Sequence, residues 1–296
     1  MQVTPILMTS ATTIPFAFFG TPYIARDTLA ALITAGYVPS VVVTSPDARR
    51  GRGMELTPCV TKELALAAGI PVLTPENLDD AFLAELQAYG CAYAVVVAYG
   101  KILPATALEA FPQGVLNVHY SLLPKYRGAS PVETALLSGE TETGVTVQRM
   151  VLKMDAGDIL AQRAVPIDPD ETIRELRPRL VAVGAELLLE VLPFFLEGAA
   201  VAVPQDESQA TYARKIDKKD GCLSLKDDSK TNWQKYRAFA ESPGTYFYAE
   251  KGDQRIRVRI EKASYIESIF TIERIVPESK ASQDFAMLVR NGWCAA

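Results

Sequence analysis

Histidine is nearly absent from the 296-residue sequence, in which His119 is the only one. A single imidazole limits histidine chemistry to one place and excludes a metal site built from several histidines. The four cysteines, Cys59, Cys91, Cys222 and Cys294, lie far apart and form no CxxC pair. This spacing excludes a zinc ribbon and a thioredoxin-type motif, and we expect a reducing compartment, the cytoplasm.

The sequence also lacks an excess of positive charge and a long apolar run. It holds 30 basic and 35 acidic residues, and the net charge of −5 argues against a globally basic nucleic-acid coat protein while allowing a local basic patch. The first basic residue is Arg26 and the apolar run 14–20 is short, so we expect neither a secretory signal nor a membrane span. Because 49% of the residues are hydrophobic, the chain can bury one large core or two ordinary ones.

Short apolar runs alternate with helical patterns from residue 14 onward, which predicts parallel strands joined by crossover helices. Two further strands and a long helix should follow, and Pro178 should separate or kink the first turns of that helix. The expected strands are 14–20, 38–45, 70–75, 92–100, 114–120, 144–150 and 158–167, and the expected helices are 23–36, 58–67, 78–90 and 171–198.

The composition changes near residue 200, where regular periodicity ends and charge increases. Residues 1–205 hold 14 basic and 21 acidic side chains, a balance of −7, whereas residues 206–296 hold 16 and 14, a balance of +2. Strand-like runs at 244–250, 255–261 and 269–276 predict a small β-domain, which a barrel would satisfy. We therefore divide the chain into a catalytic domain (1–205), a basic linker (206–220) and a β-domain (221–296).

The candidate chemistry gathers around the run GVLNVHY. Asn117 and His119 are two residues apart near the end of a predicted strand, so both side chains leave the same face, at the sheet edge where ligands of parallel sheets bind. Asp155 lies in a glycine-containing turn that would bring a carboxylate toward the imidazole. A neighbouring carboxylate predicts a raised histidine pKa, suited to acid catalysis, while an asparagine amide can donate to an oxyanion. The alternative is a structural histidine beside a capping asparagine.

Longer segments around these residues carry a resemblance. FFGTP (18–22), VVVAYGKILP (95–104), GVLNVHYSLLPKYRGASPV (114–132) and MDAGDIL (154–160) resemble the formyltransferase family that uses N10-formyltetrahydrofolate. In the tail, ATYARKIDKKDG, RAFAESPGTYF and IVPESKASQDFAMLVRNGW are similar to the branch of that family that formylates methionyl initiator tRNA. The resemblance implies a Rossmann-like domain followed by a smaller OB-like barrel that binds tRNA.

The resemblance also implies roles for the candidate residues. Asn117 would donate a hydrogen bond to the formyl oxygen, His119 would stabilise charge and assist proton transfer, and Asp155 would tune His119 and help to remove the amine proton. No metal is required, N10-formyltetrahydrofolate is the formyl donor, and a monomer is expected. The folate site would be lined by Ser121, Leu122, Leu123 and Pro124 and by the loop Tyr99, Gly100, Lys101, Ile102 and Leu103.

Two basic segments are candidates for contacts with tRNA. The loop 44–58 places three arginines among glycines, as a flexible basic finger that the resemblance sets against the acceptor end of the tRNA. Cations of the linker are suited to phosphate contacts. These candidates are Arg49, Arg50, Arg52, Arg214, Lys215, Lys218 and Lys219. The alternative for every one of them is an ordinary solvated surface charge.

The sequence departs from the family pattern at Tyr120, where the family usually has proline, and in a shortened barrel. Other functions remain open: a formyltransferase acting on a small amine, such as an amino sugar nucleotide or glycinamide ribonucleotide, or a noncatalytic folate-binding module. A nucleotide-binding oxidoreductase is disfavoured because no GxGxxG motif follows the first strand.

Overall fold

The computed structural model describes residues 14–50 and 54–295, which form two compact units. The first unit contains residues up to 118, together with 147–153 and 185–202, and the second contains 119–146, 154–184 and the rest of the chain from residue 203. Among the described helices, none is long and apolar enough to cross a membrane.

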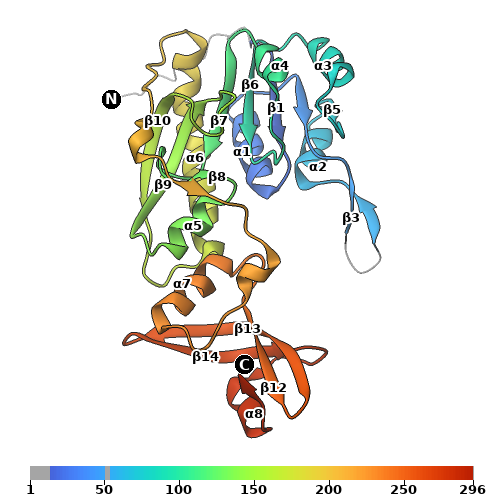
Figure 1. The fold of residues 1–296 in the computed structure, drawn as a ribbon. Coiled ribbons are helices and arrows are strands. Elements are labelled where there is room, and N and C mark those ends of the chain that lie inside the picture. Colours follow the sequence, from blue (N-terminus) through green and yellow to red (C-terminus); the bar gives the residue numbers. More distant parts are fainter. Residues whose placement is uncertain (1–13, 51–53, 296) are drawn as a thin grey trace, which may run out of the picture. The chain divides into compact units, whose positions relative to one another are not determined.

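Strands and helices alternate in the N-terminal part and strands dominate the C-terminal part (Figure 1). The strands are β1 (Phe16–Gly20), β2 (Val41–Val43), β3 (Ala48–Arg50), β4 (Glu55–Thr57), β5 (Val72–Leu73), β6 (Tyr93–Val97), β7 (Gly114–His119), β8 (Arg127–Gly128), β9 (Glu142–Arg149), β10 (Ile159–Pro166), β11 (Tyr212–Ala213), β12 (Tyr246–Lys251), β13 (Gln254–Ile266), β14 (Ile269–Pro277), β15 (Gln283–Asp284) and β16 (Cys294–Ala295). The helices are α1 (Tyr23–Thr34), α2 (Val60–Ala67), α3 (Asp80–Gln87), α4 (Ala105–Glu109), α5 (Pro131–Leu137), α6 (Ile173–Leu196), α7 (Ser229–Phe239) and α8 (Phe285–Arg290), with 3-10 turns η1 (Glu207–Gln209) and η2 (Lys218–Gly221).

The largest sheet has the strand order β10-β9-β7-β6-β1-β2-β5, and the neighbours from β7 to β5 pair in parallel. Its strands are fully apolar where both faces are covered, as in the run Phe16–Gly20 of β1, which is buried throughout. On one side of β1, Phe19 meets the rings of Tyr99 and Phe111 edge to face, at centroid distances of 5.3 and 6.1 Å. The predicted parallel α/β architecture is confirmed.

The turn from β1 into α1 depends on a glycine. A Cβ added to Gly20 would lie 2.4 Å from the Ala25 side chain and 2.8 Å from the Val97 carbonyl oxygen, closer than real atoms approach. The missing side chain therefore lets α1 start directly against the sheet, as the tight turn in FFGTP implies.

The tail forms a five-stranded sheet with the order β15-β14-β13-β12-β16, coloured orange to red in Figure 1. Its pairings are antiparallel, and a register irregularity interrupts β13 near Lys262. Alternating residues of β12, β13 and β14 pack with α8 into a small core that includes Phe247, Val258, Ile275 and Leu288. The predicted small β-domain is confirmed in this sheet.

The helix α7 ties this sheet to the remainder of the second unit. The buried Arg237 guanidinium donates hydrogen bonds to the carbonyl oxygens of Glu171 (2.8 Å) and Asp168 (2.9 Å). Trp233 stacks between the rings of Tyr236 and Tyr265, at centroid distances of 5.5 and 5.9 Å. The sequence analysis did not identify α7, although Asp228 caps its N-terminus by accepting a hydrogen bond from the Thr231 amide (2.9 Å).

Two local features refine the expectations. The helix α6 runs without interruption through Pro178, so its first turns do not form a separate segment, and it buries Leu176 and Leu180 on the two sides of the proline. The basic loop is not simply flexible, because β3 and β4 pair as an antiparallel hairpin within it. Its tip, which includes Arg52, lies outside the described residues.

Candidate active site

The strand β7 carries both Asn117 and His119 and ends at the histidine. Successive side chains of a strand alternate between its faces, so residues two apart point to the same one. Asn117 is half-buried and His119 is buried. The strand therefore presents an amide and an imidazole together at its carboxyl end, where parallel sheets bind ligands.

Asp155 lies beside His119, as the sequence analysis expected. One carboxylate oxygen, Oδ1, is 3.7 Å from Nδ1 of His119, and Nε2 on the other side of the ring is 3.0 Å from the carbonyl oxygen of Tyr126. A carbonyl oxygen can only accept, so Nε2 carries a proton and donates it. In the neutral ring, Nδ1 is then the unprotonated nitrogen, and its lone pair faces the carboxylate of Asp155. When the ring becomes charged, Nδ1 is the atom that gains the proton.

The expected direction of the His119 pKa was wrong. Burial of the ring lowers the pKa below its ordinary value of 6.5, and the charge of Asp155 and the hydrogen bond to Tyr126 oppose this effect without overcoming it. The neutral imidazole is therefore the resting form near neutral pH. Such a ring is ready to accept a proton, and Asp155 stabilises the imidazolium that results.

The lowered pKa predicts a dependence of stability on pH. Below pH 6.5 the unfolded chain protonates His119 while the folded chain resists it, so this residue stabilises the fold above that pH and loses its contribution as the pH falls. We expect the variant His119→Gln to lose less unfolding free energy than the wild type between about pH 7 and about pH 5. Urea denaturation across this range measures the difference, and parallel curves for the two proteins would contradict the prediction.

Asp155 is held in an uncommon backbone conformation. Its φ of 49° lies in the left-handed region, and its Oδ2 accepts a hydrogen bond from the Gly128 amide at 2.8 Å. Gln205 donates from Nε2 to the carbonyl oxygens of Asp155 (2.8 Å) and Gly157 (2.7 Å). Arg127, whose side chain is 0% exposed, donates to Gln205 Oε1 from Nε (3.0 Å) and Nη2 (2.7 Å). It also forms an ion pair with the carboxylate of Glu207.

The sequence analysis missed both Arg127 and Gln205. Arg127 was quoted only within the motif KYRG, and Gln205 stood at the predicted domain boundary, 50 residues from the aspartate that it contacts. No local pattern indicates a contact over that separation.

The run Ser121, Leu122, Leu123 and Pro124 follows soon after His119 and belongs to the same unit as His119 and Asp155. Its hydrogen bonds hold it in place: the Ser121 hydroxyl donates to the Lys125 carbonyl oxygen (2.6 Å), and Thr146 donates to the Ser121 carbonyl oxygen (2.6 Å). Leu122 and Pro124 are half-buried, whereas Ser121 and Leu123 are buried. Leu122 and Pro124 are therefore the residues of this run that are most accessible for contact with the ring of a bound folate.

The loop 99–103 belongs to the first unit. Tyr99 and Leu103 are buried, and burial raises the pKa of Tyr99 to about 12. Lys101 donates to the carbonyl oxygens of Pro75 (2.6 Å) and Glu76 (2.7 Å). Gly100 has a φ of 83°, and Ile102 is 75% exposed. The loop is thus anchored at three positions and presents Ile102 outward.

The predicted tRNA-binding cations differ in their surroundings. Arg49 is exposed and donates to the Met54 carbonyl oxygen (3.0 Å), while Arg50 lies in β3. Arg214 forms a bidentate ion pair with Asp220, at 2.7 and 2.8 Å. The guanidinium that was predicted to contact phosphate is therefore already paired with a carboxylate. The exposed cations that remain in this part of the chain are Lys215, Lys218 and Lys219.

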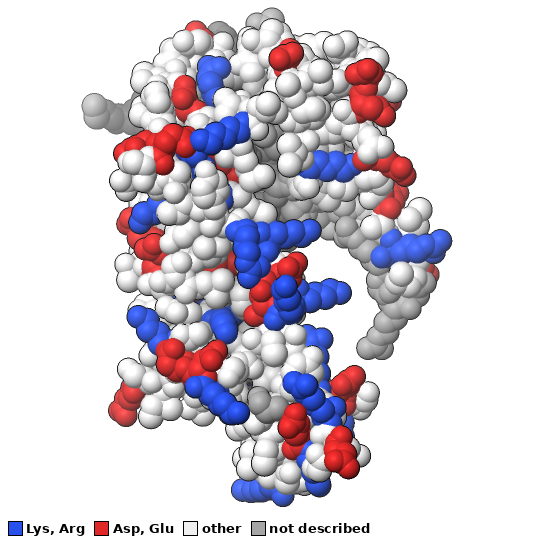
Figure 2. Space-filling model, viewed as in Figure 1, with Lys and Arg blue, Asp and Glu red and all other residues white. Residues whose placement is uncertain are grey.

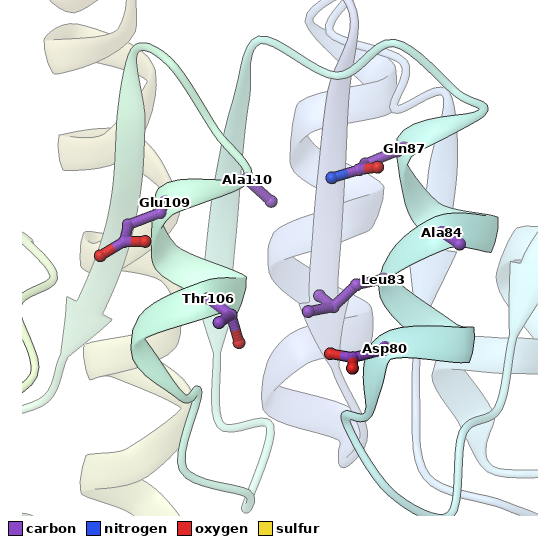
Figure 3. Close-up of a pocket in the computed structure, with 7 residues that line it drawn as sticks. All are labelled: Asp80, Leu83, Ala84, Gln87, Thr106, Glu109 and Ala110. Carbon is purple, nitrogen blue, oxygen red and sulfur yellow. The ribbon is translucent and has the colours of Figure 1, made fainter.

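A shallow hollow of about 390 Å³ opens between α3 and α4 (Figure 3). None of the predicted site residues lines it. The lining residues are Asp80, Leu83, Ala84, Gln87, Thr106, Glu109 and Ala110. Within residues 14–50 and 54–295, no group of three or more histidines, cysteines or acidic residues is arranged to hold a metal ion.

The α/β fold thus brings an asparagine and a histidine to the end of a parallel strand, with a carboxylate beside the histidine, and these groups are suited to acid–base chemistry. Residues 14–192 match the formyl transferase family. The chain belongs to this family.

Relatives and solved structures agree with this assignment. The methionyl-tRNA formyltransferase of Symbiobacterium thermophilum is 40% identical over 283 residues, which cover 92% of this chain and 86% of the relative. A solved methionyl-tRNA formyltransferase from Clostridium thermocellum has the same fold, with a TM-score of 0.59 at 14% identity, covering 88% of this chain and 97% of the other. An N-formyltransferase from Helicobacter canadensis, solved with folinic acid and dTDP-3-aminofucose, has a TM-score of 0.62 at 20% identity, with coverage of 88% and 95%.

Proposed function

We propose that this enzyme transfers the formyl group of N10-formyltetrahydrofolate to the α-amino group of methionyl initiator tRNA, which prepares that tRNA for translation initiation. The observation that carries the proposal is the His119–Asp155 pair at the end of the strand that also holds Asn117. The relatives at about 40% identity support the choice of acceptor.

The reaction needs an oxyanion donor and a proton carrier. The amine nitrogen attacks the formyl carbon, and the side-chain amide of Asn117 donates a hydrogen bond to the oxygen as it gains charge. Neutral His119 takes the proton that the attacking amine must lose, and Asp155 stabilises the imidazolium. When the tetrahedral intermediate collapses, the bond to N10 breaks and that nitrogen gains a proton, so the imidazole returns to its neutral form.

The tail supplies a surface suited to a nucleic acid. Arg255, Arg257 and Arg259 alternate along β13 and are all exposed, and we call them the β13 arginine row. Arg257 lies over the ring of Tyr246 at 3.7 Å and Arg255 over that of Tyr248 at 4.3 Å. Guanidinium groups that lie over aromatic rings can contact phosphates and stack on bases.

Figure 2 shows acidic and basic side chains mixed over the face in view, so recognition of a polyanion depends on local groups such as this row. We retain the division into a catalytic domain (1–205), a linker (206–220) and a tRNA-binding β-domain (221–296) as part of the proposal, with Tyr99–Leu103 and Ser121–Pro124 as the folate site.

The decisive experiment measures formyl transfer from N10-formyltetrahydrofolate to several acceptors in parallel. These are methionyl initiator tRNA, the same tRNA without methionine, an amino sugar nucleotide and glycinamide ribonucleotide. Transfer to the charged tRNA alone is the expected result. Transfer only to a small amine would support the formyl-transfer mechanism but contradict the proposed tRNA acceptor. Folate binding without transfer to any acceptor would support a noncatalytic folate-binding module.

The acceptor assignment also predicts an effect of the β13 arginine row. We expect Arg257→Gln to raise KM for the charged tRNA by roughly 3- to 10-fold at nearly constant kcat, and to reduce the salt dependence of binding by about one phosphate contact. Arg26→Gln, which removes the same charge from an exposed ion pair on α1, serves as the control and should match the wild type. Equal KM values for the two variants would contradict a role of this row.

A further inference from the structure

The segment from Gln205 to Thr211 contacts Asp155 and Tyr126, the two residues that flank the imidazole of His119. The sequence composition placed this segment at the boundary between the catalytic domain and the linker. Its side chains nevertheless form hydrogen bonds with the turns that contain Asp155 and Tyr126. The first contact is that of Gln205, whose amide donates to the carbonyl oxygens of Asp155 and Gly157 at 2.8 and 2.7 Å.

These two hydrogen bonds act on a residue that needs support. Asp155 has a φ of 49°, in a region that residues other than glycine occupy uncommonly even though aspartate tolerates it better than most, so neighbouring contacts that favour this conformation stabilise it against extended ones. The backbone direction at Asp155 sets where its carboxylate points. Gln205 therefore controls the 3.7 Å approach of Oδ1 to Nδ1 without touching the histidine.

Arg127 holds Gln205 in turn. Its guanidinium donates to Oε1 of Gln205 from two nitrogens, at 3.0 and 2.7 Å. With the oxygen occupied by Arg127, the amide nitrogen of Gln205 is directed at the two carbonyl groups. This arrangement fixes the orientation of an amide that could otherwise rotate.

Thr211 acts on the opposite side of the imidazole. Its hydroxyl oxygen accepts a hydrogen bond from the Tyr126 amide at 2.8 Å, and its carbonyl oxygen accepts one from the Arg127 amide at 2.9 Å. Tyr126 also has a left-handed φ, of 60°, and its carbonyl oxygen accepts a hydrogen bond from His119 Nε2 at 3.0 Å. The pairing of β11 with β8 continues this attachment through Ala129 and Ala213.

We propose that Gln205 and Thr211 position the catalytic pair: Gln205 orients Asp155, and Thr211 orients the Tyr126 carbonyl that holds His119. The inference rests on the proposed function, because it assigns the segment to that reaction. Gln205 and Thr211 are positioning residues, since each acts through another group.

The test compares Gln205→Met with Gln209→Met in the full-length chain. Gln205→Met keeps the length of the side chain and removes both donations, whereas Gln209 is an exposed neighbour on η1 whose amide donates to Ser208 Oγ. We expect kcat for Gln205→Met to fall roughly 10-fold, because the backbone of Asp155 loses the two hydrogen bonds that orient its carboxylate, while KM for the folate changes little. Thr211→Val, which removes one acceptor, should lower kcat by roughly 3-fold and tests the proposal if the first variant fails to fold.

A second readout does not depend on turnover. His119 is the only histidine, so its ring signals in an NMR titration are unique in a protein without a histidine tag. The charge of Asp155 raises the His119 pKa against the effect of burial, so misplacing that charge should lower the pKa in Gln205→Met, in the same direction as in Asp155→Asn.

The two readouts separate the two hypotheses. A folded Gln205→Met variant with the kcat and titration of Gln209→Met would overturn the positioning role. A wild-type protein that formylates none of the acceptors, but whose His119 titration still shifts in Gln205→Met, would overturn the proposed function and support the positioning of the pair.

Discussion

Replacement of His119 by asparagine is expected to lower kcat for formyl transfer by about 10²- to 10⁴-fold, the usual contribution of a general acid or base. The ring is the only imidazole in the chain, and its Nδ1 faces a carboxylate that stabilises the protonated form. An asparagine side chain places its amide near the position of Nδ1, but it cannot take up a proton. Because the change removes chemistry rather than a binding surface, folate affinity should persist.

Rapid-quench measurement of formyl transfer, at saturating donor and acceptor, determines this loss directly. Circular dichroism melting and equilibrium binding of tetrahydrofolate verify that the variant is folded and retains its site. A folded variant with a kcat within 10-fold of the wild type would remove His119 from the mechanism and leave Asn117 and substrate positioning to explain the rate.

Replacement of Arg127 by methionine is expected to lower the free energy of unfolding by about 3 kcal/mol. The guanidinium is fully buried and donates to Gln205 and Glu207, and hydrogen bonds of charged groups are worth more than neutral ones. The side chain of Glu207 is 54% exposed, so water can solvate it when its partner is lost, which keeps the cost below that of a fully stranded charge.

Urea denaturation monitored by tryptophan fluorescence tests this expectation. Arg214→Met is the matched control, because it removes another ion-paired arginine whose side chain is 65% exposed, and its unfolding midpoint should stay near that of the wild type. Similar midpoints for the two variants would show that the buried Arg127 pair contributes no more than a surface ion pair.

Much of the fold could be predicted from the alternation of apolar runs and helical patterns. The strands β1 and β6 are buried along their whole length, and β7 is buried except at Gly114 and Asn117, so all three read as nearly continuous apolar segments. The strands β12 to β14 alternate in part because one face is exposed. The hairpin of β3 and β4 and the helix α7 escaped prediction, because a three-residue strand and a polar helix with few apolar positions carry weak periodicity.

The site could be predicted in part. Asn117 and His119 were placed together because side chains two residues apart in a strand point to the same face. Asp155 was added to them because it lies in a glycine-containing turn and because of the resemblance to the family. The direction of the His119 pKa was wrong because a sequence shows a neighbouring carboxylate more readily than the degree of burial, and burial has the larger effect here.

The sequence by itself determined the parallel α/β architecture, the small β-domain and the single place for imidazole chemistry, because these follow from local periodicity and from residue counts. Only the tertiary structure decided that Nδ1 of His119 faces Asp155, and that Gln205, Thr211 and Arg127 hold this arrangement. The contacts of Gln205, Thr211 and Arg127 join residues 50 to 85 positions apart, and nothing in the local sequence specifies which distant side chain satisfies a given buried carbonyl or amide.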